Sequence, residues 1–285
     1  MKDYMSYLKF DGWDINYQFP ARSSNSCCSF YVLNDVANFF QFLKELRTDL
    51  DASFGSGKRL IIIAIHYEPY SNSLNPLGNL SGFAEYVDYF NPMIYDVKGV
   101  PIDTTGPKAP LDYQGEIARL FSFETSIEAW IRAGIPANKI NGGLAFYGHA
   151  ETALVDMSNS SNMYQPRSLT IPRGNSDEMQ EEDPVCHGPK VFSGIWKYFD
   201  LRSQGVVNMT NTATVPWIRR YDNPASMPWL FKKDTKTFVS YEDTTSISAK
   251  AKHAAQKGLM GVMVSSPTSD YNNNLIGAAV SALNA

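Results

Sequence analysis

Residues 10–20 read Phe10-Asp11-Gly12-Trp13-Asp14-Ile15-Asn16-Tyr17-Gln18-Phe19-Pro20. Alternate side chains of a β-strand point to opposite faces of the sheet. A strand is predicted over Lys9–Tyr17. In extended chain, Asp14, Asn16 and Gln18 share one face, and Trp13, Ile15 and Tyr17 share the other. The polar row suits the water-facing side of an edge strand. It equally suits the interior of a closed parallel barrel, which places its active site at the carboxyl ends of its strands.

Outward from this strand, short apolar stretches alternate with amphipathic ones, which is the pattern of βα units around a parallel sheet. Further strands are predicted at Arg59–His66, Tyr86–Tyr95, Ile140–Tyr147 and Leu259–Ser265. The helix after the first strand has a predicted buried stripe formed by Val36, Phe39, Phe40, Leu43, Leu46 and Leu50. Two more helices are predicted over Glu116–Ala133 and Ser246–Lys257, and the second ends at Gly258, which suits a left-handed C-cap.

A long segment, about 150–241, separates the last two predicted strands and is rich in Ser, Asn, Pro and Trp without a helical period. A connection of this length is too long for a plain loop in a compact domain. We therefore predict an inserted subdomain within one domain that spans residues 1–285. Its tryptophans could flank a groove, although packing inside the subdomain is the expected role of Trp196, Trp217 and Trp229.

Several segments resemble the signatures of glycoside hydrolase family 18, the family of chitinases with a TIM-type (β/α)8 barrel. The family signature Asp-Gly-x-Asp-x-Asp-x-Glu, with a Pro close behind, is matched by Asp11, Gly12, Asp14 and Pro20. The sixth-strand and seventh-strand motifs are matched by Asn91-Pro92-Met93-Ile94-Tyr95-Asp96 and Gly143-Leu144-Ala145-Phe146-Tyr147-Gly148. The approach to the eighth strand is matched by residues 238–243 and 257–264. The resemblance covers the chain nearly end to end and implies an α/β barrel.

The chain departs from the signature at two positions, 16 and 18, to which the resemblance assigns catalytic roles. The family's final Glu is the general acid that protonates the glycosidic oxygen, and Gln18 stands in its place. An amide has no titratable proton near neutral pH, and losing general acid catalysis costs about 10² to 10⁴ in rate. The family's third Asp orients the N-acetyl group that attacks the anomeric carbon, and the uncharged Asn16 stands there. The resemblance thus assigns the catalytic positions to Asp14, Asn16 and an inactive Gln18.

The resemblance also implies a set of sugar-binding residues. Tyr95 and Asp96 match residues that hold the N-acetyl sugar in the family, and Met93 and Tyr147 would line the same pocket. Asp11, at the start of the signature, is assigned to substrate binding with them.

Two further departures weaken the expected sugar contacts. The family usually places a Trp at the end of its eighth strand as the floor of the sugar site, and Ser265 stands there. An aromatic face stacked on a sugar ring contributes much of the apolar contact of such a site. The family commonly has an Arg after the Tyr-Gly of its seventh strand, where this chain has His149.

The resemblance implies that the barrel is incomplete at its N-terminal side. If the signature strand is the family's fourth, three strands should precede it, yet only about eight residues do. We therefore expect strands four to eight of the barrel, in an open sheet whose edges are exposed to pairing. The first residues, MKDYMSYLKF, lack the apolar core of a secretory signal, although full-length members of the family act outside the cell.

Composition argues against several other partners. The net charge is −4 and basic residues form no stripe, so nucleic acid is not an expected partner. The longest apolar runs, such as residues 60–65, are far too short to cross a membrane. The four histidines show no metal-ligand spacing, and neither a metal nor another cofactor is expected. Three cysteines make no disulfide scaffold, and a single bond from Cys186 to Cys27 or Cys28 is the pairing left open.

We therefore expect a chitinase-like pseudoenzyme that binds chitin or N-acetylglucosamine oligomers with little or no hydrolysis. The alternative from another class is a degenerate structural or storage domain without a ligand. A third hypothesis is a residually active chitinase that uses another acid, such as Asp14 or Asp96, although neither stands at the position of the acid.

Overall fold

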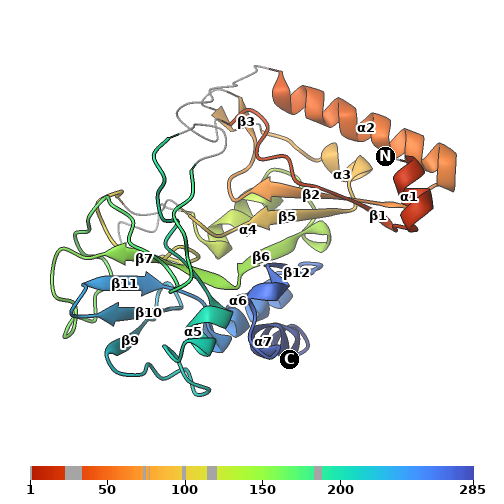
Figure 1. Cartoon of the computed structure of the whole chain (residues 1–285). Coiled ribbons are helices and arrows are strands. Elements are labelled where there is room, and N and C mark those ends of the chain that lie inside the picture. The colour runs from red at the N-terminus through yellow and green to blue at the C-terminus, as the bar shows by residue number, and fades with distance from the viewer. Residues whose placement is uncertain are drawn as a thin grey trace.

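The computed structural model describes residues 2–22, 34–72, 75–76, 78–97, 101–113, 121–182 and 188–285. Five parallel strands lie side by side in their order along the chain (Figure 1). They are β1 (Gly12–Ile15), β2 (Leu60–His66), β5 (Tyr89–Met93), β6 (Asn141–Ala145) and β12 (Gly261–Ser265). A parallel bridge between Phe90 and Ile140 joins β5 to β6. Within the described ranges, β1 and β12 each pair on one side only.

Helices cover the apolar face of these strands and bury the main core against them. The larger ones are α2 (Asp35–Phe54), α4 (Phe123–Arg132), α6 (Thr244–Gln256) and α7 (Asn274–Leu283). The stripe predicted for the first helix is confirmed, because Phe40 is partly buried and the fully buried members are Val36, Phe39, Leu43, Leu46 and Leu50. They share a cluster with Ile61, Ile63 and Ile65 of β2, whose alternate residues face the helices.

Shorter elements complete the described chain. They are α1 (Lys2–Leu8), β3 (Ser71–Asn72), β4 (Asn75–Pro76), α3 (Phe83–Tyr86), η2 (Ala137–Lys139) and η3 (Pro267–Ser269). None of the helices in the described ranges is long and apolar enough to cross a bilayer. The open disulfide pairing cannot be placed, since Cys27, Cys28 and Cys186 lie outside the described residues.

The first strand is shorter than predicted. The sequence pattern predicts a strand over Lys9–Tyr17, whereas pairing with β2 runs from Gly12 to Ile15. Before the strand, the Phe10 amide donates to the Met5 carbonyl of α1, so this amide is bonded to the helix and not to β2. The apolar side chains Trp13 and Ile15 pack against the main core, as the alternation predicts. Asn16 and Gln18 therefore follow the strand and do not belong to it.

The predicted strand Ile140–Tyr147 is two strands in two different sheets. β6 ends at Ala145, and β7 (Tyr147–Thr152) begins after a single residue, Phe146. The Phe146 amide donates to the Ser265 carbonyl at 2.8 Å, and the Phe146 carbonyl accepts from the Tyr198 amide at 2.9 Å. Its side chain is fully buried. Phe146 is therefore the backbone junction between the parallel sheet and the sheet that follows.

The chain between β6 and α6 forms a five-stranded antiparallel sheet in the order β8-β7-β11-β10-β9. In Figure 1 this sheet lies to one side of the parallel strands. The new strands are β8 (Ile195–Lys197), β9 (Trp217–Asp222), β10 (Met227–Lys232) and β11 (Thr237–Ser240), and α5 (Tyr198–Ser203) follows β8. Trp196 and Trp229 are buried in this region, and Trp217 packs against its apolar cluster. Their expected packing role is confirmed.

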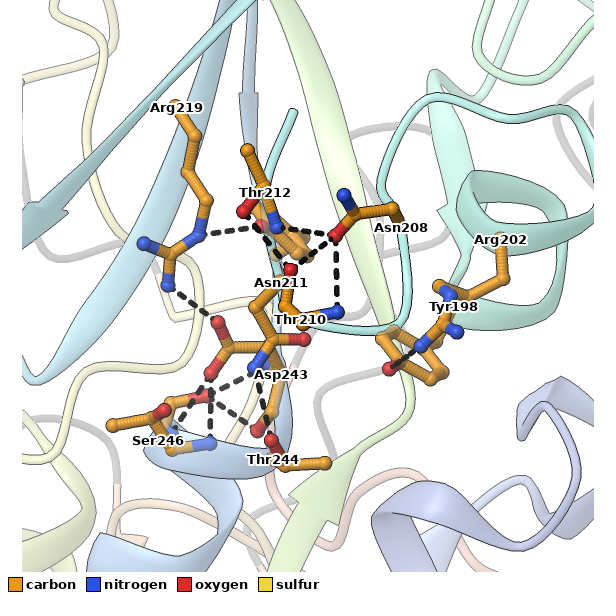
Figure 2. A network of polar contacts seen from close by, with 12 residues as sticks. Tyr198, Arg202, Asn208, Thr210, Asn211, Thr212, Arg219, Asp243, Thr244 and Ser246 are labelled. Atoms are coloured by element: carbon orange, nitrogen blue, oxygen red, sulfur yellow. Dashed lines mark hydrogen bonds and ion pairs between the residues drawn. The ribbon is translucent and has the colours of Figure 1, made fainter. Parts of the chain in front are cut away.

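A polar network fastens this sheet to helix α6 (Figure 2). Arg219 of β9 donates to the Asp243 carboxylate at 2.6 Å and to the Tyr241 hydroxyl at 3.1 Å. The other oxygen of Asp243 accepts from the amides of Thr245 and Ser246 and so caps the helix. One buried carboxylate thus satisfies the first turn of α6 and anchors β9.

The two later predicted helices are present, with different ends. The predicted helix Glu116–Ala133 begins instead at Phe123, because Ser122 forms a capping box with Thr125, and residues 114–120 lie outside the described ranges. The helix predicted over Ser246–Lys257 begins two residues earlier, at Thr244. It ends before Gly258, whose φ of 68° is the expected left-handed conformation.

Candidate functional site

The candidate site lies at the carboxyl ends of the parallel strands. Met93 is the last residue of β5, Tyr95 and Asp96 follow it, and Tyr147 opens β7 just beyond the end of β6. Gln18 follows β1, and its Nε2 donates to the Sδ of Met93 at 3.5 Å. Parallel strands bring their carboxyl ends to one edge of a sheet, so residues distant in sequence meet there.

The β1 half of the site consists of Asp14, Asn16 and Gln18, and all three residues are exposed. A thioether sulfur is a weak acceptor, so the contact with Met93 holds the Gln18 amide only weakly. Partial burial raises the pKa of the Asp14 carboxyl above its usual range. The predicted row of polar side chains is therefore exposed to solvent. Only Asp14 lies within β1, and Asn16 and Gln18 follow the strand.

Tyr95 stands between this half and the rest of the site. Burial raises the pKa of its phenol, a hydrogen bond with Ser265 opposes that rise, and the charges of Asp96 and Asp14 add to it. The phenol is therefore a neutral donor and acceptor at physiological pH. Ser265, at the end of β12, thus contacts Tyr95 at the position where the family resemblance expects a Trp.

The Asp96 half of the site consists of Tyr95, Asp96, Tyr147 and His149. The Tyr147 hydroxyl donates to Oδ2 of Asp96 at 2.7 Å, and Nε2 of His149 lies 2.8 Å from Oδ1. The rings of Tyr95 and Tyr147 meet edge to face with centroids 6.0 Å apart. Side chains from two sheets are therefore joined around one carboxylate.

The pKa of Asp96 follows from these contacts. Burial pushes it upward, but the hydrogen bonds from His149 and Tyr147 and the charges of His149 and Lys108 together lower it below its usual range. Burial and the nearby Asp96 raise the pKa of the Tyr147 phenol. Asp96 is therefore an anion that accepts two hydrogen bonds and keeps lone pairs for a ligand.

Two backbone features bring this half together. Asp96 has a φ of 55°, the left-handed region that Asp tolerates better than most residues. Gly148 lies so close to β11 that an added Cβ would meet the Ser240 carbonyl oxygen at 2.1 Å. Only glycine fits between Tyr147 and His149 at this separation of the strands, which explains the Gly of the Tyr-Gly motif.

The structure gathers most of the residues assigned from the sequence, with one exception. Asp11 precedes β1 and is exposed, at the end of the strand opposite to Asn16 and Gln18. The structure therefore does not bring it to the other site residues. The contact of His149 with Asp96 was not predicted, because the sequence analysis treated His149 only as a departure from the family's Arg. Its signal is its place two residues after Tyr147, on the same face of a strand.

The chemistry available to these groups is limited. The amides at 16 and 18 can donate and accept hydrogen bonds but have no titratable proton. The parts of the chain that the structure describes contain no cluster of three or more histidine, cysteine or carboxylate ligands for a metal ion. The site as a whole presents neutral hydroxyls, amides and an ionised carboxylate, which are groups that bind polar neutral ligands such as sugars.

Comparisons with known proteins agree on one family. The family model described as glycosyl hydrolases family 18 matches residues 1–270. A "chitinase-like effector" of Moniliophthora perniciosa is 28% identical over 97% of this chain, and one of Moniliophthora roreri is 27% identical over 97%. The chain spans 64% and 68% of the lengths of these two relatives. The crystal structure of a chitinase from Rhizomucor miehei is 26% identical, with a TM-score of 0.89, and the match covers 99% of this chain and 75% of that one.

Proposed function

The chain belongs to glycosyl hydrolase family 18, and from this premise we propose that it is a chitinase-like pseudoenzyme. In this proposal it binds chitin or N-acetylglucosamine oligomers at the carboxyl ends of the parallel strands, between Gln18 and His149, and hydrolyses them little or not at all. Asp14, Asn16 and Gln18 hold the positions of the catalytic groups, and Met93, Tyr95, Asp96 and Tyr147 contact the sugar.

The single observation that carries the proposal is the amide at position 18. It stands where the family signature has its general acid, and the hydrogen bond that the structure gives it runs to the Met93 sulfur. A group without a titratable proton cannot protonate a leaving oxygen, whatever its position. Asn16 compounds the loss, because it brings no negative charge to the cationic intermediate.

The binding part of the proposal is supported by the Asp96 half of the site. Its carboxylate, two phenols and imidazole are held by short hydrogen bonds and an aromatic contact that do not depend on Asn16 or Gln18. Rigid side chains lose little entropy when a ligand binds, so this half is preorganised. Ligand recognition can therefore persist after proton transfer is lost.

The relatives named as chitinase-like effectors also suggest a role other than cleavage. We extend the proposal accordingly, so that sequestration of chitin fragments outside the cell is the expected role. We also propose that the parallel strands correspond to strands four to eight of the family barrel, with residues 150–241 as an inserted subdomain. The absence of a pairing partner outside β1 in the described residues supports this correspondence.

The experiment that tests the function is a titration of the whole chain with N-acetylglucosamine oligomers of increasing length, followed by tryptophan fluorescence. Saturable quenching is the expected result, and its absence with every oligomer would favour the ligand-free structural or storage domain. A fluorogenic chitobioside assay on the same preparation tests catalysis. Turnover at ordinary enzymatic rates would refute the pseudoenzyme and favour the residually active chitinase.

A further inference from the structure

The chain contains three Asn-x-Ser/Thr triplets whose middle residue is not Pro, the motif that accepts N-linked sugar in secreted proteins. They are Asn79-Leu80-Ser81, Asn159-Ser160-Ser161 and Asn208-Met209-Thr210. Such triplets are frequent by chance, so the motif alone selects none of them. The surroundings of each asparagine distinguish the three.

The third triplet belongs to a short hairpin between α5 and β9. A bridge joins Val207 to Ala213 across the hairpin. Nδ2 of Asn211 donates to the Thr244 hydroxyl at 2.9 Å and so ties the hairpin to the first residue of α6 (Figure 2). Residues 208–210 are all exposed. The triplet therefore has a fixed place in the fold and faces solvent.

The Asn208 amide is held by its oxygen. Oδ1 accepts from the Thr210 amide at 3.0 Å, from the Thr210 hydroxyl at 2.9 Å and from the Thr212 amide at 2.9 Å. Among the residues that the structure describes, none is hydrogen-bonded to Nδ2, which carries no dashed line in Figure 2. Donors at an amide oxygen stabilise the negative charge that develops there when the nitrogen loses a proton. The hairpin therefore presents an accessible and activated amide nitrogen.

The other two triplets lack this combination. At the first, the Asn79 Oδ1 would lie 3.1 Å from a Cβ added to Gly134, and the middle residue, Leu80, is 3% exposed. That triplet is therefore docked against the turn that follows α4. At the second, the described contacts include no hydrogen bond between the Asn159 amide and Ser161. The third triplet is thus the best-placed acceptor of the three.

The hairpin also exposes two large apolar side chains close to this amide. Met209 is 72% exposed and Val215 is 90% exposed, and they lie one and seven residues after Asn208. Exposed apolar surface favours association with other molecules. A glycan is bulky and solubilising, so a sugar chain on Asn208 would cover this surface.

We propose that Asn208 is an N-glycosylation site whose donor is an oligosaccharide linked to a lipid diphosphate. In the transfer, Nδ2 attacks the anomeric carbon of the first sugar and forms the new bond. The bond from that carbon to the diphosphate oxygen breaks, the lipid diphosphate leaves with the bonding electrons, and Nδ2 gives one proton to a base of the transferase. The inference rests on the extracellular part of the proposed function, since secreted chains are the ones that meet this donor.

The test secretes the whole chain from a eukaryotic host behind a cleavable leader and measures its intact mass before and after treatment with peptide-N-glycosidase. The parent chain should carry a mass that the enzyme removes, and peptide mapping should find the asparagine at 208 converted to aspartate. Asn208→Gln and Thr210→Ala should each lose the glycan at 208, whereas Thr210→Ser, which keeps the hydroxyl, should retain it. Asn223→Gln, an exposed asparagine outside any triplet, is the matched control and should leave it unchanged.

Chain is recovered from the cells as well as from the medium, so a variant that folds poorly still gives a reading. An unmodified asparagine at 208 in parent chain whose leader has been removed overturns the inference, even if Asn79 or Asn159 carries sugar. So does a glycan at 208 that persists in Thr210→Ala. Titration of the same preparation with N-acetylglucosamine oligomers reports separately on the proposed function, because glycosylation of Asn208 does not require that the chain bind chitin fragments.

Discussion

The β1 half and the Asp96 half of the candidate site differ in how their side chains are held. Asp14, Asn16 and Gln18 are exposed, and the Gln18 amide is bonded to a weak sulfur acceptor. Asp96 is also half-exposed, but it accepts two short hydrogen bonds from residues of a second sheet. In the proposed function, the groups for proton transfer and those for sugar recognition therefore belong to separate segments of the chain. The difference teaches that isosteric substitution in the β1 half leaves the hydrogen bonds of the Asp96 half intact, as the proposed function requires.

The largest test of this comparison is to return ionisable groups to the β1 half. The double variant Asn16→Asp with Gln18→Glu should raise chitobioside hydrolysis by about 10²- to 10⁴-fold, because it restores a general acid and the neighbouring charge. Release of the fluorogenic group measures the rate. Asn16→Asp alone is the control and should stay near the parent, since it supplies no acid. An equal rate in the parent and the double variant would break the comparison.

A smaller effect is expected from dismantling the Asp96 half. Asp96→Ala removes the carboxylate that would accept a hydrogen bond from the sugar. A hydrogen bond to a charged group contributes about 1.5–3 kcal/mol, so affinity for an N-acetylglucosamine tetramer should fall by roughly 10- to 150-fold. Calorimetric titration measures the loss. Asp3→Ala, which removes an exposed carboxylate from α1, should bind like the parent. Unchanged affinity in Asp96→Ala would show that this half does not hold the sugar.

Truncating a side chain of the β1 half should reduce the affinity for the sugar less than Asp96→Ala does. Gln18→Ala removes an exposed amide whose hydrogen bond to Met93 is weak, so affinity for the same tetramer should fall by about threefold at most. The same calorimetric titration, run beside Asp96→Ala, gives the ratio between the two halves. A loss as large as that of Asp96→Ala would mean that position 18 holds the sugar directly.

The finest distinction concerns the two carboxyl groups. The pKa of Asp14 is raised by burial and that of Asp96 is lowered by its hydrogen bonds and neighbouring charges, which outweigh burial, from the same ordinary value of 3.8. On acidification, Asp14 should therefore take up a proton first, as carboxyl carbon chemical shifts would show. Simultaneous titration would contradict the assigned environments.

The same shifts give opposite contributions to folding stability. The stability that Asp96 contributes is present above pH 3.8 and is lost as the pH falls through its lower folded-state pKa. Asp14 instead destabilises the folded chain when ionised, and that penalty disappears as the pH falls through its raised pKa. At neutral pH, urea unfolding should accordingly find Asp14→Asn slightly more stable than the parent and Asp96→Asn less stable.

Much of the fold was predictable from local patterns. The alternation in β2 and the apolar stripe of α2 are periodic signals, and both elements lie close to where the sequence predicts them. The change of sheet at Phe146 has no periodic signal in the sequence, because the residues on both sides of Phe146 suit a strand. What changes there is the partner sheet, which is a tertiary property. The antiparallel sheet, α1 and α7 were likewise not resolved from the sequence.

The candidate site shows the same division. Family motifs placed Met93, Tyr95, Asp96 and Tyr147, which the structure gathers at one edge of the sheet. The signature at residues 11–20 also assigned Asp11 to the site, yet β1 separates Asp11 from the other site residues. The contact of His149 with Asp96 could not be found in this way, because the two residues are distant in sequence and meet only through folding.

The junction at Phe146 has a thermodynamic consequence. Phe146 connects β6 with β7, the strand that carries Tyr147 and His149. Its amide is bonded to Ser265 and its carbonyl to Tyr198. A ligand that touches both Asp96 and Tyr147 would thus act as a clamp across two sheets. Its binding energy should add to their mutual cohesion, so that the melting temperature rises with ligand concentration and both sheets melt in a single transition.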